Sequence, residues 1–224
     1  MTRNIEFSIG EFFHLYNRGV DKRIIFDDIN DYDRFMVLLY LCNSIEKVDI
    51  GDYQKQGLTL SDFWELEKSD TLVEIGSYCL MPNHFHILAR EKVQNGISLF
   101  MQKLTTAYTM YFNKKNNRTG SLFQGTFKGR HAMGDNYLKY LFAYIGLNPV
   151  KLIDKTWKEE GIKNLAETKK FLADYKFSSF IDHCGSFRIE KSILNLENFP
   201  EYFQSHKEFK DFINDWLNYR EEEV

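Results

Sequence analysis

Two short apolar segments joined by a tight turn limit the folds open to this chain. Residues 73–81 read VEIGSYCLM and residues 84–90 read HFHILAR. Pro82 and Asn83 separate them, and this residue pair is typical of turns. The sequence therefore predicts a β-hairpin at the centre of the chain.

Further elements are predicted on both sides of this hairpin. Residues 12–19 are expected to form a strand that ends in a glycine turn, and residues 28–45 a helix with apolar side chains on one face. Residues 96–115 repeat apolar side chains at three- and four-residue spacing, as an amphipathic helix does. A strand within 122–133 and a helix from an Asp135 cap to about Pro149 complete the order. This order predicts an α+β fold of the ferredoxin-like type, an antiparallel sheet with helices packed on one face.

The remaining segments are predicted as additions to this plan. Residues 46–72 are acidic and irregular, and we expect an insertion outside the core with a short helix at 61–68. Residues 153–224 are predicted as a helical C-terminal extension packed on a first domain of residues 1–152. Its helix at 205–219 places four apolar side chains on one face, at Phe209, Phe212, Ile213 and Trp216.

The charge distribution points to a phosphate-bearing partner for the central segment. The whole chain has a net charge of -3, yet residues 103–151 hold eight basic residues against the single acid Asp135. Residues 111–131 mix basic, amide, glycine and aromatic residues, which suits single-stranded or hairpin nucleic acid. A solvated loop followed by an edge strand explains the same pattern equally well.

Location and redox state follow from two simpler features. Glu6 and Glu11 interrupt the apolar N-terminal stretch, and no run approaches the roughly 18 apolar residues of a membrane span, so a cytoplasmic location is expected. The three cysteines fit neither a disulfide framework nor a zinc pattern. Buried thiols are therefore predicted at Cys42, Cys79 and Cys184.

A His-x-His pair begins the second strand of the hairpin. Side chains alternate along a strand, so His84 and His86 are expected to share one face while Phe85 points to the other. Two adjacent imidazoles can hold a divalent cation from one wall of a site, but a third ligand is needed. Half-exposed histidines beside a turn are the simpler explanation of the pair.

The helix after Asp135 offers the missing ligand. Tyr144 and Asn148 are four residues apart and are expected on one helical face. An asparagine oxygen suits Mg²⁺ or Mn²⁺, and a tyrosine beside the metal can act as a nucleophile. Tyr144 also continues a stripe with Tyr137 and Tyr140, and such a stripe is often core.

Five segments together resemble a known family. They are FHLYNRGVDKRIIFDDINDYDRFMVLL, YCLMPNHFHIL, YFNKKNNRTGSLFQGTFKGR, YLKYLFAYIGLNPVK and YKFSSFIDHCG, and they span residues 12–185. In order and approximate spacing they resemble the REP-associated tyrosine transposases. These belong to the single-tyrosine HUH superfamily, as do small insertion-sequence transposases that act on single-stranded DNA. The resemblance implies the same ferredoxin-like palm.

The resemblance also implies roles for individual residues. The His-hydrophobic-His motif of the family falls on His84 and His86, and its nucleophilic tyrosine, just before Asn-Pro-Val, falls on Tyr144. The polar residue that completes the metal site falls on Asn148. The implied reaction is cleavage of single-stranded DNA at or near a hairpin through a 5'-phosphotyrosine, assisted by Mg²⁺ or Mn²⁺. Expected DNA contacts are Lys103, Lys114, Lys115, Arg118, Gln124, Lys128 and Arg130.

Two other functions fit the same residues. One is a hydrolytic metal-dependent nuclease in which Tyr144 only packs, and the other is a domesticated protein that binds hairpin DNA without transposition. In each case the expected partner is single-stranded or hairpin DNA rather than a membrane. The protein is expected to be a monomer or a homodimer.

Overall fold

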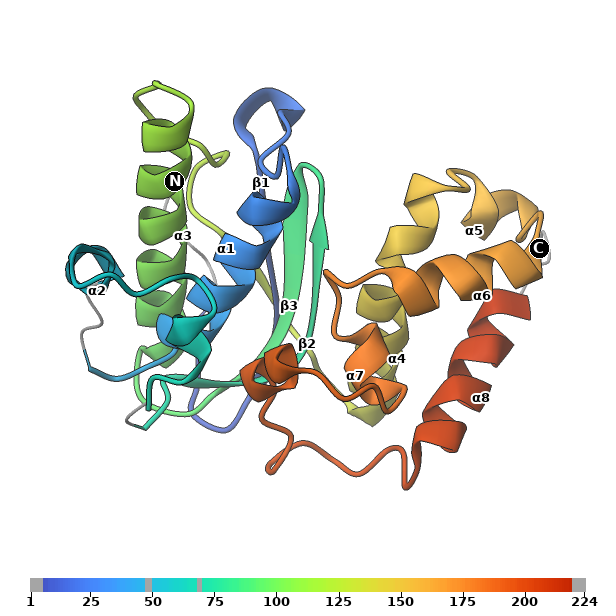
Figure 1. The fold of residues 1–224 in the computed structure, drawn as a ribbon. Helices are drawn as coiled ribbons and strands as arrows, with labels where there is room; N and C mark the ends of the chain where they lie inside the picture. Colours follow the sequence, from blue (N-terminus) through green and yellow to red (C-terminus); the bar gives the residue numbers. More distant parts are fainter. Residues whose placement is uncertain (1–5, 47–49, 68–69, 219–224) are drawn as a thin grey trace.

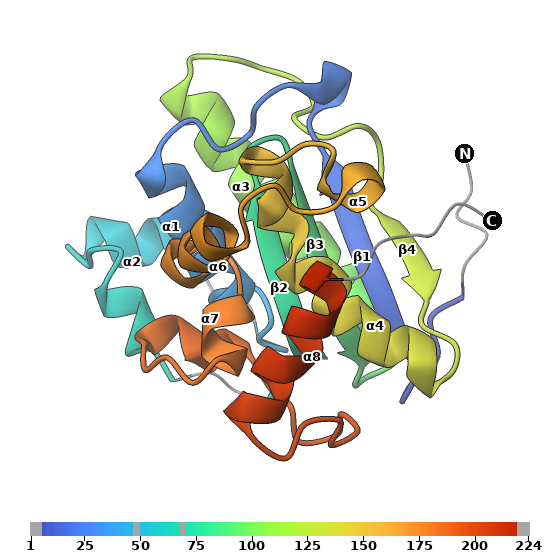
Figure 2. The same cartoon turned by 90° about the vertical axis from the view of Figure 1, so that its right-hand side faces the viewer.

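A four-stranded antiparallel sheet lies at the centre of the molecule. The computed structural model describes residues 6–46, 50–67 and 70–218. The strands follow the order β2-β3-β1-β4, which Figure 2 shows from left to right. They are β1 (Phe12–Arg18), β2 (Val73–Met81), β3 (His84–Glu91) and β4 (Lys128–His131). The predicted hairpin is thus β2 and β3, paired from Val73 with Glu91 to Met81 with His84.

Two helices cover the first face of the sheet. They are α1 (Ile29–Leu41) and α3 (Gly96–Lys115) (Figure 1). The α1 helix begins where the Asp28 side chain accepts hydrogen bonds from the backbone amides of Asn30 and Asp31 in the first turn. Apolar side chains of both helices meet Phe85 and Ile87 in one buried core. The predicted ferredoxin-like plan is confirmed, since β1, α1, β2, β3, α3 and β4 follow its order.

Helices also cover the second face, where the sequence pattern predicted none. Here α4 (Asp135–Gly146) packs on β2 and β3, with α7 (Phe180–His183) and α8 (His206–Asn218) beside it (Figure 1). All nine residues of β2 are buried, as a strand covered on both faces requires. The 3₁₀ turn η3 (Asn148–Leu152) follows α4, and the rest of the extension contains α5 (Trp157–Glu160), α6 (Leu165–Asp174) and η4 (Ile189–Ile193). The division of the chain at residue 152 stays a prediction.

The boundaries of α4 differ from the prediction at both ends. Asp135 is the first helical residue, and Gly134 occupies the capping position without a side-chain hydrogen bond. The Asp135 carboxylate accepts a hydrogen bond from the Tyr202 hydroxyl instead, at 3.0 Å. The helix ends at Gly146, so Asn148 begins the 3₁₀ turn η3 and is not part of α4.

The insertion is less separate from the core than predicted. It contains α2 (Ile50–Lys55) and η2 (Asp62–Trp64). Of the helix predicted at 61–68, only the three residues of η2 are helical, residues 65–67 are not, and residue 68 lies outside the described residues. Phe63 is fully buried in the core formed by α1 and α3. The Tyr40 hydroxyl of α1 donates to the Leu66 carbonyl oxygen, at 3.1 Å. The expectation of a segment outside the core was therefore wrong, because Phe63 anchors it there.

The extension is tied to the sheet along the outer edge of β2. The Leu80 amide donates to the Phe177 carbonyl oxygen at 2.9 Å, and the Ser179 amide donates to the Tyr78 carbonyl oxygen at 3.0 Å. Just beyond, the Arg188 guanidinium forms two hydrogen bonds with the Asp182 carboxylate, at 2.8 and 2.6 Å. Arg188 also donates to the Tyr78 hydroxyl of β2 at 3.1 Å, so backbone pairing and this side-chain hydrogen bond together hold the extension against β2.

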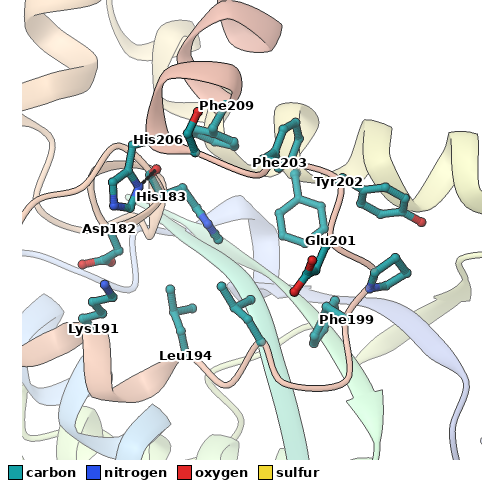
Figure 3. A pocket seen from close by; sticks show the side chains of 14 residues that line it. Asp182, His183, Lys191, Leu194, Phe199, Glu201, Tyr202, Phe203, His206 and Phe209 are labelled. Atoms are coloured by element: carbon teal, nitrogen blue, oxygen red, sulfur yellow. Dashed lines mark hydrogen bonds between the residues drawn. The ribbon is translucent and has the colours of Figure 1, made fainter.

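The extension encloses a cavity of about 450 Å³ against α4 (Figure 3). Phe199, Tyr202 and Phe203 line it, and the His183 carbonyl oxygen and His206 Nδ1 are hydrogen-bonded at its rim, 2.8 Å apart. From α4, the Phe142 side chain lines the same cavity. Residues two apart on a helix point to nearly opposite sides, so this cavity lies across α4 from Tyr144.

The remaining predictions concern cysteines and membranes. Cys42 and Cys79 are buried thiols, as predicted, whereas Cys184 is only half-buried. Burial raises the pKa of the Cys42 thiol to about 12. Within the described residues no helix combines the length and apolar character needed to cross a bilayer. The cytoplasmic location stays a prediction.

Candidate functional site

His84 and His86 stand at the start of β3, immediately after the hairpin turn. His84 pairs with Arg18 across the sheet and His86 pairs with Tyr16, so both imidazoles lie on the α4 face. Their ring centroids are 5.0 Å apart. Phe85 points to the opposite face and packs against α1. The alternation expected from the sequence is therefore present.

The end of α4 brings Tyr144 and Asn148 to the same place. The Tyr144 ring packs edge-to-face on His86, with centroids 5.6 Å apart. Asn148 is buried, and its Nδ2 donates to the Tyr144 carbonyl oxygen at 2.8 Å. This bond fixes the side-chain amide just past the helix end. His84, His86, Tyr144 and Asn148 all line one cleft of about 410 Å³.

The donor set fits a divalent cation with mixed nitrogen and oxygen ligands. Burial, followed by the Lys151 and Arg18 charges, lowers the pKa of His84 to about 4. Burial also holds the pKa of His86 well below its usual value. Both imidazoles are therefore neutral at pH 7, as metal ligands must be. No cluster of three histidine, cysteine or acidic side chains suited to a metal occurs among the described residues. Asn148, which lines the same cleft, carries an amide oxygen of the kind that Mg²⁺ and Mn²⁺ accept as a ligand.

The Tyr144 hydroxyl is protonated at neutral pH. Burial is the largest cause that raises its pKa, with Tyr137 and Tyr16 adding to it, and the Asn148 side chain acts in the opposite direction. A phenol is a weak nucleophile in this form. For Tyr144 to act as a nucleophile, another group must therefore take up the hydroxyl proton or stabilise the phenolate that its loss leaves.

Three of the predicted DNA-contacting residues lie beside this cleft. Gln124 and Lys128 line it, and Gln124 Oε1 accepts a hydrogen bond from Arg18 Nε at 2.8 Å. Arg130 lines an adjoining hollow of about 300 Å³ and lies over the Tyr137 ring, 4.9 Å from its centroid. Tyr144 lines both spaces, so the cleft and the hollow meet at its ring.

The other four predicted contacts lie on or just after α3, which covers the opposite face of the sheet. Lys103 Nζ donates to the Ser44 and Glu46 carbonyl oxygens, and Lys115 forms ion pairs with Asp28 and Asp31. Arg118 donates to Asn113 and to the Ser121 carbonyl oxygen, and Lys114 is exposed in the last turn. The structure does not bring these four side chains to the cleft, and their DNA contacts stay a prediction.

Three basic residues at the site were missed from the sequence. Arg18 and Lys151 line the cleft, and Lys158 Nζ of α5 lies 4.6 Å from the centroid of the Tyr144 ring. Lys151 lies in the basic segment and directly follows the Asn-Pro-Val motif, a position from which its place at the site could have been predicted. Arg18 lies in the first strand and Lys158 in the extension, where only the tertiary fold reveals the proximity.

Because these histidines are buried, the folded protein is expected to lose stability in acid. Burial, followed by the Arg130 charge, lowers the pKa of His14 to about 4. The pKa of His14 is lower in the folded protein than in the unfolded chain. Its contribution to the free energy of unfolding is therefore fully present above pH 6.5 and is lost as the pH falls towards 4. Between pH 7 and pH 5, His14 alone is expected to remove about 2 kcal/mol from the free energy of unfolding. Urea denaturation with a chelator measures this, and a smaller loss is expected for His14→Gln; equal losses would contradict the assignment.

Comparison with known proteins agrees with this picture. Residues 58–148 match the family model described as Transposase IS200 like, a segment that ends at Asn148 and contains the cleft residues of β3 and α4. The resemblance indicated by the sequence motifs is thus confirmed. Among solved structures, a REP-associated tyrosine transposase bound to a REP hairpin is similar, with 14% identity over 85% of this chain and 90% of that chain and a TM-score of 0.49. No curated protein matches.

Proposed function

We propose that this chain, whose residues 58–148 are an IS200-like transposase region, cleaves and rejoins single-stranded DNA at or near a hairpin. Tyr144 is the nucleophile, and a divalent cation, Mg²⁺ or Mn²⁺, is held by His84, His86 and Asn148. The observation that carries the proposal is the convergence of these four side chains in one cleft. They come from β3, α4 and the turn after α4, and nothing in simple core packing requires two neutral imidazoles, an amide and a phenol to meet there.

The reaction conserves the energy of the broken bond. The Tyr144 oxygen forms a bond to phosphorus while the bond from phosphorus to the 3'-oxygen breaks. The phenolic proton is lost, the 3'-oxygen leaves as a hydroxyl after taking up a proton, and the 5'-phosphate stays on the protein. Attack by a 3'-hydroxyl on the phosphotyrosine reverses these steps and rejoins a strand. A bound cation would supply Lewis-acid stabilisation of charge on the phosphate.

The protein's own residues position both reactants. The Tyr144 ring is held edge-to-face against His86, and Lys158 Nζ lies over the same ring, 4.6 Å from its centroid. Packed rings restrict the tyrosine to a few orientations, which lowers the entropic cost of in-line attack. The charges of Arg18, Lys128 and Lys151 line the cleft beside it. These cations suit the phosphates on either side of the scissile bond.

The cleft cations give a prediction about salt dependence. Lys151→Gln is expected to lower the slope of log affinity against log salt by roughly 0.7 to 1, because one phosphate contact is lost. Lys114→Gln, at an exposed lysine on α3, tests the contact expected there from the sequence; if the DNA lies in the cleft, this variant is expected to leave the slope unchanged. Fluorescence anisotropy with a labelled hairpin oligonucleotide, in chelator, measures both. A reduced slope for Lys114→Gln alone would place the DNA on the α3 side.

The proposed reaction is tested with labelled hairpin oligonucleotides taken from repeats that flank the protein's own gene. The protein is incubated with 5'- or 3'-labelled DNA, with Mn²⁺ or with chelator, and resolved on a denaturing gel. The 3'-labelled fragment is expected in a metal-dependent, protease-sensitive shifted band, because the phosphotyrosine carries the downstream strand. Cleavage without this band would favour a hydrolytic nuclease. Binding without cleavage would favour a domesticated hairpin-binding protein.

A further inference from the structure

A third histidine lies behind the proposed metal-binding pair. His14 is on β1, two residues before Tyr16, which pairs directly with His86 across the sheet. Alternation places His14 on the same face as His86. The side chain is buried, with 6% of its surface exposed. Nothing in the sequence pattern singles it out, because its hydrogen-bond partner His86 is 72 residues away.

His14 and His86 are joined by a buried hydrogen bond. His14 Nε2 and His86 Nδ1 are 2.8 Å apart, and the two rings stack with centroids 5.0 Å apart and planes inclined by 27°. Since this bond occupies Nδ1 of His86, only Nε2 of that ring is left to reach a ligand in the cleft. The Tyr144 ring packs edge-to-face on both imidazoles, with centroids 5.6 Å from each.

The direction of this bond decides whether His86 can bind a cation. A neutral imidazole carries one proton, on one of its two nitrogens. If His86 donates from Nδ1, its Nε2 keeps a lone pair for a metal. If His14 donates instead, the His86 proton lies on Nε2 and blocks coordination. Ligand histidines in proteins usually donate their second ring N–H to such an outer partner.

We infer that His14 is a positioning residue that accepts a hydrogen bond from His86 Nδ1 and thereby fixes the tautomer and ring orientation in which His86 Nε2 faces the cleft. The inference rests on the proposed function, since it concerns the cation of that site. His14 itself does not touch the cation or the DNA. Through the shared ring packing it also holds Tyr144 against the metal-binding pair.

Two substitutions separate positioning from packing. His14→Gln keeps an acceptor oxygen near the place of Nε2, whereas His14→Phe keeps a ring and removes the acceptor. Mn²⁺ binding without DNA is measured by calorimetry and by the electron paramagnetic resonance signal of the free ion. His14→Phe is expected to bind Mn²⁺ about 10- to 100-fold more weakly than the wild type, and His14→Gln within a few-fold of it. Thermal unfolding and hairpin binding in chelator check that both variants fold.

A metal-free readout makes the result independent of activity. In ¹⁵N-labelled wild type, the His86 ring is expected as the Nδ1–H tautomer, and His14→Phe is expected to shift it towards Nε2–H. Unchanged Mn²⁺ affinity in a folded His14→Phe variant, or equal weakening in His14→Gln, would overturn the role of His14 and leave the proposed function standing. Absence of Mn²⁺ binding by the wild type would overturn the metal site and this inference together.

Discussion

Replacing Tyr144 by phenylalanine is expected to abolish the covalent protein–DNA product and to slow cleavage on the order of a thousandfold or more. The substitution removes only the oxygen that the proposed reaction joins to phosphorus. Packing on His14 and His86 involves the ring, so the fold and hairpin binding are expected to persist. Denaturing gels with 3'-labelled DNA measure the product, and anisotropy in chelator measures binding.

Tyr140 provides the matched control for this experiment. It lies one turn before Tyr144 on α4, with ring centroids 5.8 Å apart, and lines the adjoining hollow. Tyr140→Phe is expected to keep the covalent product within a few-fold of wild type. The assignment would be contradicted if Tyr144→Phe formed a normal adduct or if Tyr140→Phe alone lost it. The nucleophile would then be placed at Tyr140, and the reason for the proposed placement of the metal would be removed.

Replacing Arg188 by methionine is expected to lower the free energy of unfolding by about 3–5 kcal/mol. The guanidinium is the ion-pair partner of Asp182, whose side chain has no exposed surface, and it also donates to the Tyr78 hydroxyl and the Ser178 carbonyl oxygen. Without it a buried carboxylate keeps its desolvation cost and loses its counter-charge. Urea denaturation followed by circular dichroism gives the free energy.

A second substitution identifies the cause of that loss. If the unpaired carboxylate is responsible, Arg188→Met combined with Asp182→Leu is expected to recover part of the lost stability, because the buried charge is gone. Additive losses in the double variant would show that Arg188 acts mainly through its bonds to Tyr78 and Ser178. A loss below about 1 kcal/mol in the single variant would contradict a buried ion pair.

The elements of the first sheet face were predictable because their signals are local. Asp28 precedes an apolar helical repeat, and Pro82 and Asn83 separate two strand-like segments, so neighbours in sequence decide each element. The His84–His86 pair was placed on one face for the same reason. The cleft could be predicted only in part. Tyr144 and Asn148 were linked to it through the family resemblance, since the spacing alone favoured core packing for the tyrosine.

What could not be predicted depends on contacts between distant segments. The His14–His86 bond needs the register of β1 on β3, and Lys158 reaches Tyr144 only because α5 folds back over α4. The charge count of the α3 segment also omits distant contacts. The density of lysines suggested phosphate binding, which stays a prediction, and Lys115 forms ion pairs with Asp28 and Asp31, two carboxylates that lie outside residues 103–151.

The backbone pairing between β2 and residues 177–179 has a consequence for how copies of this protein meet. An open sheet presents two rows of unpaired amides and carbonyls, and each is a template on which another chain can add a strand. On the β2 side the extension already occupies that template. On the other side β4 is only four residues long and carries Lys128 and Arg130. The extension therefore leaves less of the β2 edge open to strand addition by a second copy of this chain.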